Sequence, residues 1–342
     1  MVHGGRCHAY RKRIQTVYAI WDCALSFYGQ RPGLQVVGAP SGPGWHGGRN
    51  KTIRHGEAMK KLQKIVIFCW AVLLPGCMLS TQERLQQVDN QAEQVGLHRA
   101  WVDGGSFDIW TASRLTQPEQ PITVYIEGDG FAWVTRYRPS DDPTPHLPIA
   151  WQLAREDPAP NLLYLARPCQ YSMAVQGKAR GCRVPIWTHQ RFSAEVLETM
   201  QSALLELLSR AHAESASLNL VGFSGGAAIA ALLAESGRFN VRSLQTVSAN
   251  LDHRALTRWH GVSEMQGSLN PMDGVAALRN IPQRHLVGAE DTITPPKLVA
   301  QVVQRIGHCA TLSIYPDLTH GDTRWGAVWK QLPPMRPVCA AP

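Results

Sequence analysis

A serine stands in a short glycine-rich segment where an apolar stretch passes into a helical one. The segment "GFSGG" at 222–226 follows the predicted strand 218–224 and opens the predicted helix 225–236. A sharp strand-to-helix turn needs small residues two positions before and two after its central residue, because bulkier side chains would collide. The turn lifts the hydroxyl above the sheet, beside a helix N-terminus that favours negative charge. Ser224 is therefore the candidate nucleophile, and the alternative is a helix N-cap in a glycine-rich turn.

A carboxylate that could complete this chemistry lies at the end of the predicted strand 284–290. The segment "GAEDTITPP" offers Glu290 and Asp291 there. Parallel strands end at one edge of a sheet, so an acid just past a strand end lies on the edge that carries the nucleophile. We favour Asp291 as the acid, and Glu290 stays open.

A histidine that could act as the base lies in "LTHGD", after the predicted last strand 310–316. His320 is the one histidine of 13 beyond that strand. Its imidazole can reach Ser224 with one nitrogen and Asp291 with the other. Asp317 and Asp322 flank it as competing partners.

An oxyanion would need backbone N–H donors near the serine. The N–H of Gly225 is one, and the loop "YIEGDGFAW" at 125–133 supplies the other from Asp129 or Gly130. A carboxylate facing an anion would repel it, so we expect Glu127 and Asp129 to point aside and brace the loop. The alternative is an Asp-Gly turn between two strands.

The order of predicted elements indicates the fold. Strands and helices alternate, which predicts an α/β domain with a mostly parallel central sheet and helices on both faces. The predicted strands are a hairpin within 98–115, then 122–128, 161–168, 218–224, 241–250, 284–290 and 310–316; the predicted helices are 82–95, 148–157, 192–211, 225–236, 296–307 and 323–332. We expect one catalytic domain over 97–335, preceded by a linker and helix at 77–96.

The motifs "EGDGF", "GFSGG", "GAED" and "LTHGD", in this order, resemble the α/β-hydrolase superfamily. The chain also resembles a group of bacterial hydrolase-like lipoproteins, through "YIEGDGFAW", "YLARPCQY", "RFSAEV" and "NLDHRALTRWHG", over about residues 82–332. "EGDG" replaces the commoner His-Gly start of the oxyanion loop. The resemblance implies an α/β-hydrolase fold with small cap insertions and hydrolysis of a small-molecule ester, with no cofactor or metal. We expect Phe131, Phe223 and Tyr171 to contact the substrate.

The segment "MKKLQKIVIFCWAVLLPGC" at 59–77 has a basic start, an apolar run and a small residue before a cysteine. This pattern predicts a signal peptide over 59–76, because the run is too short to span a bilayer; a buried core helix is the alternative. "LPGC" resembles the lipobox of bacterial lipoproteins. That likeness implies lipidation at Cys77 and a periplasmic protein anchored to the outer membrane. Residues 1–58 are then a disordered extension or an over-extended gene start.

The net charge of +8 is unevenly distributed. Residues 1–58 carry 8 Lys and Arg against 2 Asp and Glu, and residues 59–76 carry three Lys and no acid. The remaining 23 basic and 24 acidic residues nearly cancel. The body of the chain therefore lacks the excess of positive charge that nucleic-acid binding would need.

Four of the eight cysteines lie in the predicted domain and its tail. An even number in an exported protein favours disulfides. Of three possible connectivities we favour Cys169 with Cys182 and Cys309 with Cys339. A metal site is disfavoured, because no Cys-x-x-Cys or His-x-x-x-His pairing occurs.

Overall fold

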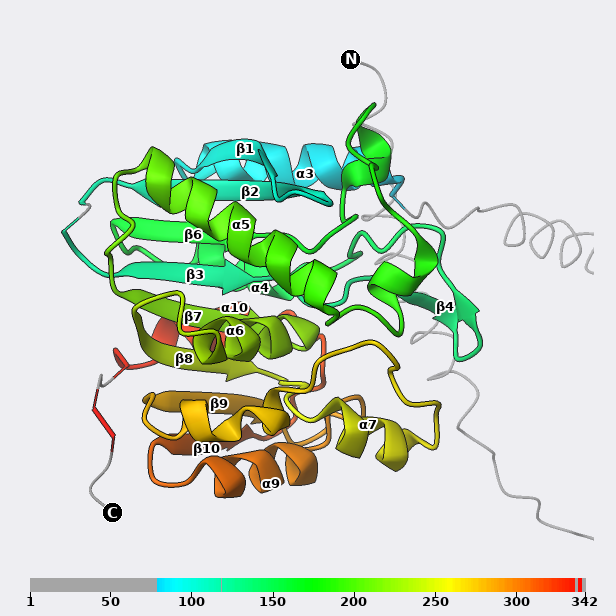
Figure 1. Cartoon of the computed structure of the whole chain (residues 1–342), viewed down its shortest axis with the longest axis vertical. Coiled ribbons are helices and arrows are strands. Elements are labelled where there is room, and N and C mark those ends of the chain that lie inside the picture. Colours follow the sequence, from blue (N-terminus) through cyan, green and yellow to red (C-terminus); the bar gives the residue numbers. More distant parts are fainter. Residues whose placement is uncertain (1–78, 118, 336–337, 340–342) are drawn as a thin grey trace, which may run out of the picture. The chain divides into compact units, whose positions relative to one another are not determined.

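The structure is a computed structural model and describes residues 79–117, 119–335 and 338–339 (Figure 1). The described residues belong to one compact unit that begins at Leu79. The predicted signal peptide, Cys77 and residues 1–58 lie outside them. Within the described part of the chain, no helix is long and apolar enough to cross a membrane.

An eight-stranded sheet forms the centre of the unit (Figure 1). Its strands are β1 (His98–Asp103), β2 (Asp108–Leu115), β3 (Ile122–Ile126), β6 (Asn161–Leu165), β7 (Leu218–Phe223), β8 (Val241–Val247), β9 (Gln283–Gly288) and β10 (Ala310–Tyr315). They lie in the order β1-β2-β6-β3-β7-β8-β9-β10. Strand β2 is antiparallel to both neighbours, and all later pairs are parallel. This is the α/β-hydrolase fold, so the predicted fold class is confirmed.

Helices cover both faces of the sheet, and each face has its own apolar core. One face holds α5 (Ala194–Arg210), α6 (Gly225–Glu235), α8 (Val275–Leu278) and α9 (Pro296–Ile306); the other holds α3 (Thr81–Gln94), α4 (Ile149–Arg155) and α10 (Trp325–Gln331). Side chains of a strand alternate between faces. In β7, Leu218 and Leu220 join the first core, and Val221 and Phe223 join the second.

The connections on the carboxyl side of the strands carry the smaller elements. They are the hairpin β4 (Trp133–Thr135) and β5 (Arg138–Pro139), the helix α7 (His253–His260), and the 3₁₀ turns Ser172–Ala174, Val184–Trp187 and Pro271–Asp273. Figure 1 shows β4 and α7 at the same end of the sheet. These segments lie at the carboxyl end of the parallel strands, the end that carries Ser224.

Helix α3 packs into the same unit as the sheet. It begins with a capping box, in which the Ser80 hydroxyl accepts from the Glu83 N–H and the Glu83 carboxylate accepts from the Ser80 N–H. Leu85, Val88 and Ala92 lie in the second core. The helix that the sequence places before the catalytic domain is thus part of that domain's core.

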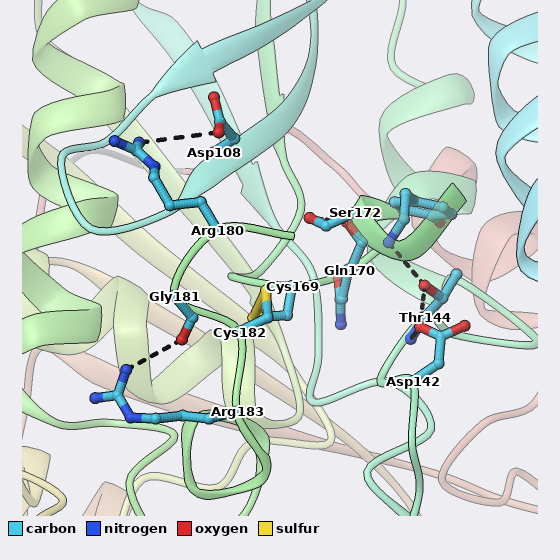
Figure 2. Close-up of a disulfide and its surroundings, with 11 residues drawn as sticks. Asp108, Asp142, Thr144, Cys169, Gln170, Ser172, Arg180, Gly181, Cys182 and Arg183 are labelled. Carbon is cyan, nitrogen blue, oxygen red and sulfur yellow. Dashed lines mark hydrogen bonds and ion pairs between the residues drawn. A yellow bond between two sulfur atoms is a disulfide. The ribbon is translucent and has the colours of Figure 1, made fainter. Parts of the chain in front are cut away.

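Two disulfides join the four cysteines in the pairing that the sequence favours, and Figure 2 shows the one between Cys169 and Cys182. Cys169 pairs with Cys182, 13 residues on, and Cys309 pairs with Cys339, 30 residues on. Closing loops of such lengths stabilises a fold by roughly 3–4 kcal/mol through the entropy of the unfolded chain. The second bridge ties the C-terminal tail to the start of β10.

Glu235, at the C-terminal end of α6, is a partly buried carboxylate whose Oε1 has no hydrogen-bond partner among the described residues. Burial and, second, the charge of Asp273 raise the pKa of Glu235 to about 8. The neutral form is therefore the stable one in the folded protein.

We expect Glu235→Gln to flatten the pH dependence of stability. Because the folded pKa of Glu235 is raised, its favourable contribution is complete below pH 4.5 and is lost as the pH rises through about 8. Thermal unfolding should show similar Tm values for variant and wild type at pH 5, and a variant more stable by about 2–4 °C at pH 9. The exposed Glu198→Gln is the control, and equal pH profiles for the two variants would refute the prediction.

Candidate active site

Ser224 lies at the turn between β7 and α6, in a backbone conformation that few residues adopt. Its φ is 52° and its ψ is −118°. A Cβ on Gly222 would lie 2.4 Å from the Ala227 Cα, and one on Gly226 would lie 2.3 Å from the Ile126 carbonyl oxygen. Both glycines are therefore required by close backbone approach. The Ser224 side chain makes no cap hydrogen bond to α6, which disfavours the N-cap alternative.

The structure brings Ser224, His320 and Asp291 together. The Ser224 Oγ lies 2.9 Å from the His320 Nε2, and the His320 Nδ1 lies 2.9 Å from the Asp291 Oδ2. Glu290, the open alternative for the acid, is exposed. The three residues come from the ends of β7, β9 and β10, which meet at the carboxyl edge of the sheet.

Asp291 is held by donors on its own loop. Its Oδ1 accepts from the N–H groups of Ile293 (2.9 Å) and Thr294 (2.8 Å), and its Oδ2 accepts from the Thr294 hydroxyl (2.9 Å). Burial raises the pKa of Asp291, but hydrogen bonds and charge from His320 and the Thr294 N–H outweigh it, so the pKa is lowered. The side chain is thus a buried, fixed carboxylate that orients the imidazole.

Thr294 is a residue of this site that sequence reasoning missed. Besides Asp291, its Oγ1 lies 3.2 Å from the His320 Nδ1. The sequence could have indicated Thr294, because Asp side chains commonly accept hydrogen bonds from N–H groups two or three residues further on and so stabilise a turn. A hydroxyl three residues after the aspartate can donate to the same carboxylate.

Two predicted oxyanion donors are free in the described part of the chain. Neither the N–H of Gly225 nor that of Asp129 has an acceptor there. Gly225 is the first residue of α6, so its N–H has no intrahelical partner. The N–H of Gly130, the alternative donor, is also free, and Gly130 has a φ of 68° beside the Pro143 carbonyl. These N–H groups are available to an oxyanion, and the Asp129 carboxylate lies against Gly225, with its Oδ1 1.9 Å from where a Cβ on Gly225 would stand.

Glu127 is fully buried and braces the oxyanion loop. Its carboxylate accepts from the N–H groups of Gly128, Ala150 and Trp151 and from the Tyr164 hydroxyl, at 2.9–3.3 Å. Burial raises the pKa of Glu127, and these donors oppose the rise. The carboxylate thus links the loop to the N-terminus of α4 and does not face the oxyanion position.

Asp129 is held by two arginines that sequence reasoning missed. The Arg191 Nη1 lies 2.8 Å from the Asp129 Oδ2, and the Arg167 Nη1 lies 3.5 Å from the Oδ1. Burial lowers the pKa of Arg167 to about 10. The sequence could have indicated Arg167, because it lies two residues after β6 and so at the same edge of the sheet as Ser224.

The disulfide between Cys169 and Cys182 lies next to the residue that holds this loop (Figure 2). Gln170 donates from its Nε2 to the Gly128 carbonyl at 2.9 Å and accepts at its Oε1 from the Arg167 N–H at 3.0 Å. The bridge therefore constrains the backbone at the point where the oxyanion loop is held.

The three residues predicted to contact substrate have different surroundings. The Phe223 ring lies 5.2 Å from the His320 ring, and the half-buried Phe131 ring lies 4.4 Å from the His146 ring. Tyr171 is fully buried, 5.6 Å from the Trp110 ring. The structure places Phe223 beside the histidine of the site and Tyr171 within the core.

Comparison of the chain with known proteins finds similar structures but no similar sequence. No protein-family model and no curated protein sequence matches the chain. Its structure is similar to that of a proposed lipase from Acinetobacter baumannii (13% identity, 75% of this chain and 95% of the other, TM-score 0.49). It is also similar to an α/β serine hydrolase homologue from Coxiella burnetii (14%, 68% and 94%, TM-score 0.44). A third neighbour is an α/β serine hydrolase without a lid from Xanthomonas campestris (17%, 70% and 97%, TM-score 0.41).

We expect Glu127→Gln to destabilise the fold by about 2–3 kcal/mol, because the amide would turn an NH₂ donor toward a group that now donates to the carboxylate. Urea unfolding would measure the change. Glu119→Gln, at an exposed position, is the matched control. A loss no larger than that of the control would show that the four hydrogen bonds do not hold the loop.

Proposed function

We propose that this protein is a serine hydrolase that acts on carboxylic esters. The observation that carries the proposal is the continuous hydrogen-bonded series from the Ser224 hydroxyl through His320 to the buried Asp291. It stands beside the free N–H of Gly225 at the N-terminus of α6 and the free N–H groups of Asp129 and Gly130 in the oxyanion loop. A nucleophile, a base with a fixed orientation and an oxyanion site are the three parts that acyl transfer needs.

The geometry assigns a role to each group. The His320 Nε2 accepts the proton of the Ser224 hydroxyl as the oxygen attacks the ester carbonyl, and Asp291 stabilises the imidazolium that forms. The N–H of Gly225, with that of Asp129 or Gly130, would bind the developing oxyanion. His320 then returns the proton to the leaving alcohol, and water, activated by the same imidazole, hydrolyses the acyl-enzyme.

A fluorophosphonate probe tests the proposal. We expect it to label the wild-type chain at Ser224, and Ser224→Ala to abolish labelling. Asp291→Asn should lower kcat by about 10⁴-fold, because it favours the wrong imidazole tautomer. If the folded protein does not label, the result would instead favour a non-catalytic binding protein that retains the hydrolase fold.

A second experiment would separate an esterase from an amidase or peptidase. It compares the rates of hydrolysis of a nitrophenyl ester and a nitroanilide that carry the same acyl group.

We further propose that the protein works in the bacterial envelope, anchored through a lipid on Cys77. The two disulfides support an oxidising compartment. The predicted signal peptide and lipobox-like "LPGC" support the anchor.

Metabolic labelling with a palmitate analogue tests the anchor. We expect labelled wild-type protein in the membrane fraction and unlabelled Cys77→Ala protein. Cys69→Ala, in the predicted signal peptide, is the matched control and should label as wild type does. A labelled Cys77→Ala variant would rule out this attachment site.

A further inference from the structure

Buried polar atoms without hydrogen-bond partners are concentrated beside Ser224. Among the described residues, 14 such side-chain atoms occur. Four belong to three side chains in contact with one another: Asp129 Oδ1, Arg167 Nε and Nη1, and Arg191 Nε. The Asp129 Oδ1 and the Arg167 Nη1 form an ion pair with each other at 3.5 Å without a hydrogen bond, whereas both Nε atoms have no partner. A fifth is the Oδ1 of Asn250, whose N–H donates to the Ser224 carbonyl. Buried polar groups normally have partners, so such a group of unsatisfied atoms requires an explanation.

The arginine pair has more donors than its protein partners use. Two guanidinium groups offer ten N–H donors. Arg167 donates one hydrogen bond, from its Nη2 to the Arg191 carbonyl; Arg191 donates to the Asp129 Oδ2 and the Met265 Sδ. Asp129 is the one carboxylate within ion-pair distance of either arginine in the described structure, and the charge of Glu127 also acts on Arg167. The group thus has more N–H donors than its protein partners use.

Asp129 connects this group to the position where the reaction would occur. The Asp129 Oδ1 lies 1.9 Å from where a Cβ on Gly225 would stand. Gly225 follows Ser224 directly and carries the predicted oxyanion donor. The side chains of Arg191 and Asp129 are 17% and 16% exposed, whereas that of Arg167 is 5% exposed. Arg191 is therefore the arginine of the pair that is partly open to solvent, and Arg167 is the buried one.

We infer that the site prefers ester substrates that carry a negatively charged oxygen group, a carboxylate or a phosphate, close to the scissile bond, with Arg191 as its direct contact. The inference rests on the proposed hydrolase function and names the substrate class of the same site. Arginine suits this role because its planar fork donates two parallel hydrogen bonds to such a group. A competing explanation, that the two arginines only neutralise Asp129, predicts no charge preference.

Matched substrate pairs distinguish the two explanations. 4-Nitrophenyl hemisuccinate and 4-nitrophenyl levulinate differ by a carboxylate against a methyl ketone on the acyl side. 4-Acetoxybenzoate and 4-acetoxyacetophenone carry the same difference on the leaving group. We expect kcat/KM for the anionic member of at least one pair to exceed that of its neutral partner by about tenfold or more. The favoured pair would show on which side of the bond the charge binds.

Variants then assign the preference to Arg191. Arg191→Gln should bring the anionic-to-neutral ratio to about one, and Arg191→Lys should retain part of it. Asp129→Asn should leave the ratio unchanged or raise it, because a competing carboxylate is removed. The ratio is the readout, since a general loss of activity affects both members of a pair equally. Arg279→Gln, at an exposed position, is the control.

The outcomes separate this inference from the proposed function. Ratios near one in a wild-type protein that the fluorophosphonate probe labels would overturn the charge preference and leave the hydrolase intact. An unchanged ratio in a folded, labelled Arg191→Gln variant would overturn the role of the arginine. A wild-type protein that neither labels nor hydrolyses any of the four esters would overturn both proposals.

Discussion

The close approach of α6 to the strands β3 and β7 is the constraint on which the site depends. It leaves no room for a Cβ at Gly222 or Gly226 and holds Ser224 at positive φ. Residues in such conformations cost of order 1–3 kcal/mol and persist where surrounding packing holds them. Here α6 is buried from Gly225 to Ala234, so the core stabilises a turn that is locally unfavourable.

That turn places a helix N-terminus against a loop that carries two acidic side chains, and the fold compensates the two charges differently. Glu127 is surrounded by three N–H groups and a hydroxyl, which satisfy it without a cation. Asp129 pairs with Arg167 and Arg191. Neither charge is left uncompensated beside the predicted oxyanion position. The loop can therefore be acidic in sequence and still accept an anion.

The disulfide of the neighbouring loop belongs to the same support. It joins Cys169 to Cys182, and Gln170 beside it bonds both the Gly128 carbonyl and the Arg167 N–H. One covalent bridge therefore restricts the oxyanion loop and one of its arginines together. This coupling makes the disulfide a determinant of the site geometry as well as of stability.

The sequence by itself determined the features that depend on short-range sterics and on the alternation of strands and helices along the chain. These are the strand–turn–helix around Ser224, the parallel sheet, and the chain order of serine, acid and histidine. Tertiary structure decided the rest: Asp291 in place of Glu290 beside His320, the burial of Tyr171, and the arginines against Asp129. A spacing pattern reports which residues reach one edge of the sheet. It does not report side-chain direction or partners distant in the chain, because packing between elements sets both.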